Sequence, residues 1–142
     1  MPEELKYTYD SFFIDVKTLA NEIKKSGKQY KSLLIVANGR LFIGALLAQE
    51  LEINHIDTVS IKSYTEKEQN AIHIINSLDH VLKEKDVLIV DDIVDTGNTI
   101  KYLQERLKAD TAVLFYKPEI AHTKPTYHLH ETSKWVKFPW EK

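Results

Sequence analysis

The sequence predicts an α/β domain with a mostly parallel central sheet flanked by helices. Segments with strand patterns alternate along the chain with segments that have helix patterns. Three short segments, at 33–37, 86–92 and 111–117, each contain a continuous apolar run. Such runs are typical of strands that helices cover on both faces. The 142 residues suffice for one domain with one core, and no linker or repeat divides them.

Three segments carry the apolar periodicity of helices. The first is expected over residues 11–26, with Asp10 as its N-terminal cap and Gly27 at its end. The second is expected over residues 41–51, and the third after the strand at 86–92. Their predicted apolar faces are, in order, Phe12, Phe13, Val16, Leu19, Ala20 and Ile23; Leu41, Ala45, Leu46, Ala48 and Leu51; and Ile100, Leu103 and Leu107.

The remaining segments are less regular. Residues 55–64 alternate well enough for one strand, and the polar stretch 65–70 is expected to connect it onward. Residues 71–78 are too short and ambiguous to assign. From Pro118 the chain contains three prolines and many aromatic residues, so we expect irregular structure there.

Composition limits the function classes. The chain has 43% hydrophobic and 28% charged residues, which is typical of a soluble globular protein. It has no cysteine, which excludes disulfides, thiolate metal sites and a cysteine nucleophile. A net charge of −2 gives no sign of nucleic-acid binding. Because no apolar run could cross a bilayer and the N-terminus does not read as a signal peptide, we expect a cytoplasmic protein without membrane insertion.

The stretch VLIVDDIVDTGNTI, residues 87–100, is the most informative part of the chain. It predicts a buried strand that runs into acids and then into a turn before a helix. Ligands of open α/β sheets bind beyond the carboxyl ends of the strands. In the turn, Gly97 allows close approach, and backbone N–H groups at the start of the helix suit a phosphate monoester. The stretch matches neither a Walker loop nor a dinucleotide fingerprint.

The carboxylates beside this turn suit a different part of the same ligand. Asp91 and Asp92 cannot bind phosphate directly, but carboxylates accept hydrogen bonds from sugar hydroxyls and bind magnesium. Asp95, closer to the turn, is placed to handle a proton. The pattern therefore indicates a phosphorylated sugar. The alternative is that Thr96 or Asn98 only caps the helix and that the aspartates are solvated loop residues.

The same stretch resembles the phosphoribosyl-pyrophosphate motif of the type I phosphoribosyltransferases. Residues 41–64, 116–118 and 135–141 are also similar to the xanthine-guanine branch of that family, in the same order and spacing. The resemblance implies the type I phosphoribosyltransferase fold in a single domain, 1–142. It implies a core at about 30–117 and a small hood. The hood consists of the C-terminal residues, about 118–142, together with the N-terminal segment.

The resemblance also implies roles at the sugar-phosphate end. Asp91 and Asp92 would contact the ribose hydroxyls, and Asp92 would also help to hold Mg²⁺. Asp95 would lie near the imidazole nitrogen of the purine as the catalytic general base. The residues implied for the 5′-phosphate are Thr96, Gly97, Asn98 and Thr99.

At the purine end, the resemblance implies that Lys117 donates to the exocyclic oxygen of a 6-oxopurine. Trp135 would stack on the base, and the carbonyl of Val136 would accept from the purine edge. From the residues alone, Lys117 could be an ordinary strand-end lysine and Trp135 could pack in the core, as we expect for Trp140. His122, His128 and His130 lack the spacing of metal ligands, so ordinary histidines are the simpler interpretation.

Two places depart from the family pattern. The pyrophosphate loop usually reads as a small residue, Arg or Lys, and two glycines, whereas here it is Ala37, Asn38, Gly39 and Arg40. Arg40 would either restore the lost charge from a new direction or crowd the site. In a second loop, Asn70 stands where the xanthine-guanine enzymes carry an arginine, with Lys67 nearby.

The implied activity is a purine salvage reaction. Ribose 5-phosphate passes from phosphoribosyl pyrophosphate to guanine, xanthine or hypoxanthine, giving GMP, XMP or IMP, with Mg²⁺ as cofactor. The resemblance implies a homodimer or homotetramer. Two alternatives stay open: a weakly active or inactive nucleotide-binding relative with a regulatory role, and a partner protein with a vestigial site. The sequence does not rank the three purines.

Overall fold

A four-stranded parallel sheet forms the centre of the molecule. A computed structural model describes residues 3–36, 41–64, 71–74 and 85–141 of the chain. The sheet has the order β3-β2-β6-β8, and every neighbouring pair is parallel. Its strands are β2 (Ser32–Val36), β3 (His55–Val59), β6 (Val87–Val90) and β8 (Asp110–Ala112). The predicted α/β class with a mostly parallel sheet is therefore confirmed.

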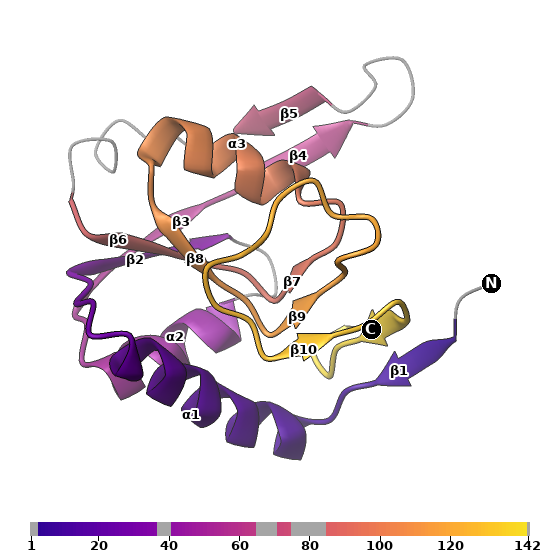
Figure 1. The fold of residues 1–142 in the computed structure, drawn as a ribbon, viewed down its shortest axis with the longest axis horizontal. Coiled ribbons are helices and arrows are strands. Elements are labelled where there is room, and N and C mark those ends of the chain that lie inside the picture. Colours follow the sequence, from indigo (N-terminus) through magenta and orange to yellow (C-terminus); the bar gives the residue numbers. More distant parts are fainter. Residues whose placement is uncertain (1–2, 37–40, 65–70, 75–84, 142) are drawn as a thin grey trace.

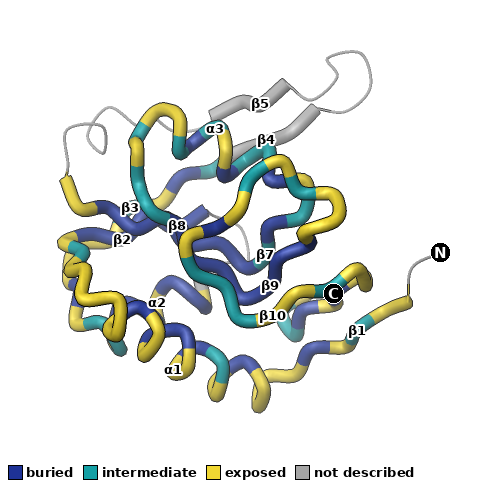
Figure 2. Tube along the Cα trace, in the orientation of Figure 1, coloured by how far each residue is buried: buried dark blue, intermediate teal, exposed yellow. Residues whose placement is uncertain are grey.

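Helices cover both faces of this sheet. Figure 1 places α1 (Tyr9–Lys25) and α2 (Leu41–Leu51) on one side and α3 (Asn98–Leu107) on the other. Because side chains alternate along a strand, Leu33 packs in the cluster with α1 and α2, while Leu34 packs in the cluster with α3. All residues of β2 and β6 are buried, which explains why every residue of these strands except Ser32 is apolar (Figure 2).

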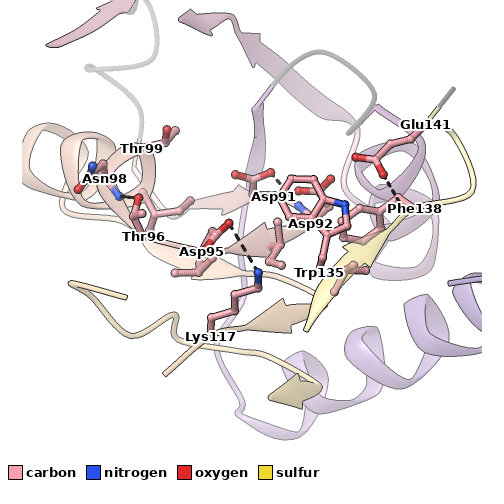
Figure 3. A pocket seen from close by; sticks show the side chains of 15 residues that line it. Asp91, Asp92, Asp95, Thr96, Asn98, Thr99, Lys117, Trp135, Phe138 and Glu141 are labelled. Atoms are coloured by element: carbon pink, nitrogen blue, oxygen red, sulfur yellow. Dashed lines mark hydrogen bonds and ion pairs between the residues drawn. The ribbon is translucent and has the colours of Figure 1, made fainter. Parts of the chain in front are cut away.

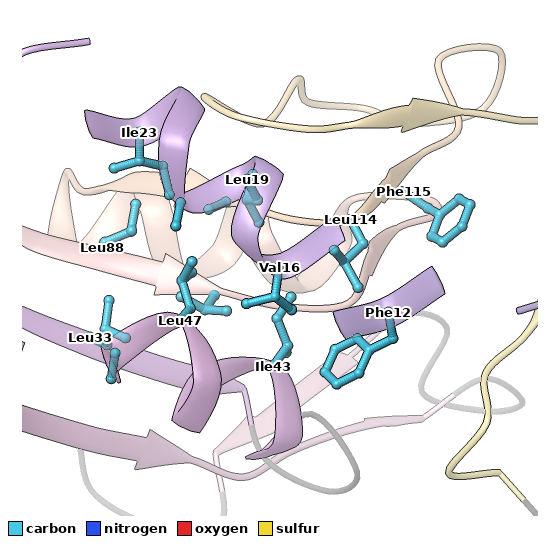
Figure 4. Close-up of a cluster of buried hydrophobic side chains, with 14 of the residues drawn as sticks. Phe12, Val16, Leu19, Ile23, Leu33, Ile43, Leu47, Leu88, Leu114 and Phe115 are labelled. Carbon is cyan, nitrogen blue, oxygen red and sulfur yellow. The ribbon is translucent and has the colours of Figure 1, made fainter. Parts of the chain in front are cut away.

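The first helix differs from the prediction at both its cap and its face. Thr8, not Asp10, is the N-cap, and its hydroxyl accepts a hydrogen bond from the Ser11 N–H at 3.2 Å. Asp10 instead lies in the first turn, where a carboxylate also favours the helix dipole. Phe13 is 51% exposed, because it lies beside rather than on the buried stripe. The other predicted face residues are buried (Figure 4), and Gly27 follows the helix end with φ +79°.

The second helix has the predicted bounds but a different buried face. Ile43 and Leu47, which were not predicted, are fully buried against the sheet. Ala45 is exposed and Leu46 and Leu51 are only partly buried, whereas Ala48 is buried as expected. The helix is apolar on nearly all sides, so its pattern did not single out one face. The side chain of Leu41 lies outside the described set.

The predicted strand at 55–64 is two strands, because Ser60 separates β3 from β4 (Ile61–Tyr64). Strand β4 pairs antiparallel with β5 (Ala71–Ile74), which resolves the first half of the ambiguous segment 71–78 as a strand. Residues 65–70 and 75–84 lie outside the described ranges.

The predicted strand at 111–117 is also divided, and its halves belong to different sheets. Strand β8 is an edge strand of the central sheet. Strand β9 (Phe115–Tyr116) belongs to a separate three-stranded sheet, in which it lies between β7 (Ile93–Val94) and β10 (His130–Glu131). The expectation of irregular structure after Pro118 was incomplete, since β10 and β11 (Trp135–Lys137) form there.

The two ends of the chain meet in a small parallel ribbon. Strand β1 (Glu4–Lys6) pairs with β11, with Glu4 opposite Trp135 and Lys6 opposite Lys137 (Figure 1). Phe138, which follows β11, packs against Phe115 of β9, with ring centroids 5.8 Å apart. This contact joins the ribbon to β9. In the described part of the chain, no helix is long and apolar enough to span a membrane.

Candidate active site

Two buried acids mark the carboxyl end of β6. Asp91 and Asp92 are 5% and 4% exposed, and the Asp92 N–H donates to Asp91 Oδ1 at 2.8 Å. The carbonyl of Asp92 accepts from the N–H groups of Leu114 and Phe115, both at 3.1 Å. The backbone of the acid pair is thus fixed by the chain leading into β9.

The turn that follows presents the N-terminus of a helix. Gly97 is the N-cap of α3 and has φ +85°, a conformation that favours glycine. No side chain caps this helix, and its first turn carries no acidic residue. The nearest approach to a cap is a long 3.4 Å contact from the Asn98 N–H to Thr96 Oγ1. The first N–H groups of α3 have no hydrogen-bond partner within the helix. The first turn of α3 also supplies no carboxylate to interact with the positive end of the helix dipole.

A loop from the C-terminal part of the chain lies behind this turn. The His122 N–H donates to the carbonyl of Thr96 at 2.7 Å, and Thr123 Oγ1 donates to Gln104 on α3 at 3.2 Å. A Cβ added to Gly97 would lie 3.0 Å from Thr123 Cγ2. Sequence reasoning missed Thr123 and considered His122 only as a metal ligand. No local pattern signals a contact of this kind between distant segments.

Lys117 leaves β9 as a buried cation. It is 7% exposed, and its N–H donates to the carbonyl of Val94 at 3.0 Å. Its Nζ lies 3.8 Å from Asp95 Oδ2 and 5.8 Å from the centre of the Trp135 ring. An ordinary strand-end lysine would extend into solvent, so burial speaks against that alternative.

The C-terminal strand contributes an exposed aromatic ring. Trp135 is 56% exposed, so the alternative that it packs in the core is wrong. Its neighbour Val136 is buried, as is Phe138. Trp140 packs as expected, stacked on Phe138 with ring centroids 5.1 Å apart. Glu141 also faces this region, and its Oε2 accepts from the Phe138 N–H at 3.0 Å.

These groups surround one pocket of about 260 Å³ (Figure 3). It is lined by Asp91, Asp92, Ile93, Val94, Asp95, Thr96, Gly97, Asn98, Thr99, Ile100, Lys117, Trp135, Val136, Phe138 and Glu141. All predicted residues for ribose, 5′-phosphate and purine are among them. Glu141 was not predicted, although it ends a stretch that carried the resemblance. The predicted pyrophosphate loop, Ala37, Asn38, Gly39 and Arg40, lies outside the described residues.

The histidines form no metal centre in the described part of the chain. His130 Nε2 lies 2.8 Å from Asp15 Oδ2, and His128 Nε2 lies 3.5 Å from Glu131. Among the residues that the structure covers, no group of three or more His, Asp or Glu side chains is arranged to hold a metal by itself. Any divalent ion at Asp91 and Asp92 would therefore need further oxygen ligands from water or a bound substrate.

Comparisons with known proteins agree on one family. A family model described as a phosphoribosyl transferase domain matches residues 7–141. The chain is 31% identical to xanthine-guanine phosphoribosyltransferase of Chromohalobacter salexigens, covering 98% of this chain and 85% of that protein. Purine phosphoribosyltransferase from Pyrococcus horikoshii superposes with a TM-score of 0.85 at 27% identity, covering 98% and 95% of the two chains. Xanthine-guanine-hypoxanthine phosphoribosyltransferase of Helicobacter pylori gives 0.80 at 28% identity, covering 98% and 94%.

Proposed function

The chain belongs to the phosphoribosyltransferase family, and from that premise we propose that it is a purine salvage glycosyltransferase. It transfers ribose 5-phosphate from phosphoribosyl pyrophosphate to a 6-oxopurine. The bond from the anomeric carbon to pyrophosphate breaks, and a bond from that carbon to a purine nitrogen forms. The purine loses one proton, and pyrophosphate leaves.

One observation carries this proposal: a single pocket joins a helix N-terminus, two buried acids, a buried lysine and an exposed tryptophan. Each group suits a different part of a purine nucleotide. The helix N-terminus suits a phosphate, the acids suit sugar hydroxyls, and the lysine and tryptophan suit an oxygenated aromatic base.

At the sugar-phosphate end, the turn 96–99 binds the 5′-phosphate in this proposal. The N–H groups of Asn98 and Thr99 belong to the first turn of α3 and donate to phosphate oxygens. Asp91 and Asp92 accept from the ribose hydroxyls. Because their backbone is tied to the segment entering β9, they hold the sugar at a fixed distance from Lys117.

At the base end, Lys117 donates to the exocyclic oxygen at position 6. A fixed cation there favours an acceptor oxygen and disfavours the amino group of adenine. Trp135 stacks on the ring, and the carbonyl of Val136 accepts from its edge. Asp95 lies 3.8 Å from Lys117 Nζ, so both groups reach the same side of the base, and Asp95 takes the imidazole proton.

The donor set at the acids also fits Mg²⁺. Magnesium is usually held by one or two carboxylates together with substrate phosphates and water. Asp92, with Asp91 beside it, supplies such carboxylates, and the substrate supplies further oxygens. When bound, the ion would neutralise charge on the departing pyrophosphate.

We further propose that 37–40 binds pyrophosphate and that Arg40 supplies its cation. The hood comprises residues from about 118 together with the N-terminal segment, and the β1–β11 pairing supports this division. We also propose that the protein is cytoplasmic and forms a homodimer or homotetramer. The alternative of a nucleotide-binding relative with a regulatory role is not favoured, because the curated relative is an enzyme.

The test is a panel of bases. Purified protein is mixed with phosphoribosyl pyrophosphate, Mg²⁺ and guanine, xanthine, hypoxanthine or adenine, and nucleotide formation is followed. We expect turnover with 6-oxopurines and none with adenine. No turnover with any base, in a folded protein that still binds GMP, would contradict the proposal and favour the regulatory alternative.

A further inference from the structure

The turn at 96–99 is held from behind by a segment that is distant in the sequence. The His122 N–H donates to the carbonyl of Thr96 at 2.7 Å. An added Cβ at Gly97 would lie 3.0 Å from Thr123 Cγ2, so the methyl group of Thr123 packs close to this glycine. In Figure 1 the loop after β9 passes beside the start of α3. Because glycine has more backbone freedom than other residues, the fixed shape of the turn depends on such outside contacts.

The loop of residues 117–123 connects two parts of the pocket. Its first residue, Lys117, lines the pocket, and the carbonyl of Lys117 accepts from the Ala121 N–H at 3.0 Å. Its last residue, Thr123, is fixed to α3, because the Thr123 hydroxyl donates to Gln104 Oε1 at 3.2 Å. The loop therefore runs from the lysine proposed for the base to the turn proposed for the phosphate.

The hydrogen bond between Thr123 and Gln104 closes this loop onto the helix. Both residues are partly buried, and Gln104 lies on α3, the helix whose first N–H groups belong to the turn. Without the hydroxyl, Gln104 Oε1 loses this donor and the loop loses its side-chain bond to α3. The pocket is lined by the turn residues and not by Thr123. Thr123 can thus affect a ligand only through the turn.

We propose that Thr123 is a positioning residue for binding of the 5′-phosphate. Its hydroxyl, bound to Gln104, holds the loop against Gly97, so that the turn keeps one conformation before the ligand arrives. A site that already has its binding conformation loses less conformational freedom on binding, and its affinity is higher. This inference rests on the proposed function, because it uses the assignment of the turn to the 5′-phosphate.

The test is a pair of substitutions that separate the hydroxyl of Thr123 from its methyl group. Thr123→Val removes the hydroxyl and keeps a methyl group, whereas Thr123→Ser keeps the hydroxyl. We expect Thr123→Val to weaken binding of ribose 5-phosphate by about fivefold, the effect of one net hydrogen bond, and Thr123→Ser to stay within about twofold of the unmodified protein. Calorimetric titration with ribose 5-phosphate measures both dissociation constants.

Thr126→Val is the matched control. The Thr126 hydroxyl accepts from the Thr111 N–H at 3.0 Å, so this substitution also removes one hydroxyl hydrogen bond, but at β8 rather than at the turn. It should leave the affinity for ribose 5-phosphate unchanged. Gln104→Leu removes the acceptor of the Thr123 hydroxyl. Adding it to Thr123→Val should weaken binding no further, because the two side chains act as one unit.

Steady-state kinetics gives a second readout, which a general loss of stability would not reproduce. In Thr123→Val, the KM for phosphoribosyl pyrophosphate should rise, while kcat and the KM for hypoxanthine stay close to those of the unmodified protein. This split is expected because the contact acts on binding of the 5′-phosphate and not on the base or the reacting atoms.

The outcomes separate positioning from a purely structural role. Unchanged affinity for ribose 5-phosphate in Thr123→Val, or an equal loss in Thr123→Ser or Thr126→Val, would overturn the inference. If urea denaturation shows that Thr123→Val does not fold, Gln104→Leu decides in its place and must weaken ribose 5-phosphate binding by a similar factor. If the unmodified protein binds ribose 5-phosphate but forms no nucleotide from any base, the proposed function fails, and the binding comparison still decides the inference.

Discussion

At the scale of single residues, the ion pair between Lys117 and Asp95 carries the proposed chemistry. The lysine is buried, whereas the side chain of Asp95 is 46% exposed, so the two partners are not equivalent. An exposed carboxylate contributes little to stability through such a pair. We therefore expect Asp95 to act in the reaction with substrate and to contribute little to the stability of the fold.

Asp95→Asn removes a proton acceptor and keeps the shape of the side chain. We expect kcat to fall by roughly 10²–10⁴-fold, the usual contribution of a general base, while the dissociation constant for GMP stays close to that of the unmodified protein. Steady-state kinetics and a binding titration measure the two effects. Turnover like that of the unmodified protein would remove Asp95 from the mechanism.

Arg40→Gly tests the departure in the pyrophosphate loop. If Arg40 supplies the missing cation, its loss should weaken binding of phosphoribosyl pyrophosphate by about 1.5–3 kcal/mol, the worth of one hydrogen bond to a charged group. The KM for phosphoribosyl pyrophosphate measures this loss. Lys108→Gly is the matched control, because it removes an exposed cation at φ +51°, where glycine is accepted. Unchanged or improved activity in Arg40→Gly would mean that the arginine only crowds the loop.

At the scale of elements, the junction between β7 and α3 depends on Gly97, and Gly27 offers a matched comparison. Both glycines have positive φ, +85° and +79°. An added Cβ at Gly97 meets Thr123, whereas at Gly27 nothing lies within 4 Å. Alanine at either position should cost about 1–2 kcal/mol of unfolding free energy from left-handed strain.

Only Gly97→Ala should also weaken binding of ribose 5-phosphate, because the turn must shift away from Thr123. Urea denaturation measures stability, and calorimetric titration with ribose 5-phosphate measures the dissociation constant. Equal phosphate affinity in the two alanine variants would contradict the assignment of this turn to the 5′-phosphate.

The elements also show why the sequence predicted the class of the fold but missed the cap of α1 and the separate short strands β9 and β10. The continuous apolar runs identified β2 and β6 because burial on both faces leaves a strong pattern. Thr8 and Asp10 are both good caps, so the pattern could not choose between them. Strands β9 and β10, of two residues each, depend on pairing between distant segments and leave no periodicity to detect.

At the scale of the whole molecule, the pocket residues assigned to ribose, phosphate and purine could be proposed from the sequence because they lie in one motif and two short resemblances. Glu141 and Thr123 could not, since their positions depend on the hydrogen bond to Phe138 and the packing against Gly97. Trp135 was ambiguous for a similar reason. Whether a tryptophan is buried depends on which strand pairs beside it, and the partner here is β1 from the other end of the chain.

A polar network far from the pocket joins three distant parts of the chain. Asp110 on β8 accepts from the Tyr30 hydroxyl and from Lys28 Nζ, the latter at 3.0 Å. The Tyr30 hydroxyl also lies 2.9 Å from that of Tyr127, which donates to Ser26 Oγ at 2.9 Å. Burial alone would raise the pKa of Asp110, but the hydrogen bonds from Tyr30 and Lys28 outweigh it and hold that pKa below its ordinary value.

Asp110→Asn should therefore destabilise the protein in a pH-dependent way. Because the pKa of Asp110 is lower in the folded than in the unfolded protein, its ionised carboxylate stabilises the folded state at pH values above the unfolded pKa of about 3.9. This contribution is lost as pH falls through the folded pKa. The gap in unfolding free energy between the two proteins should be largest near neutral pH and should narrow below about pH 4. Urea titrations across this range measure it. Asp86→Asn, exposed at φ +58°, is the control that should show no such narrowing, and a gap for Asp110→Asn that is constant with pH would contradict the role of its charge.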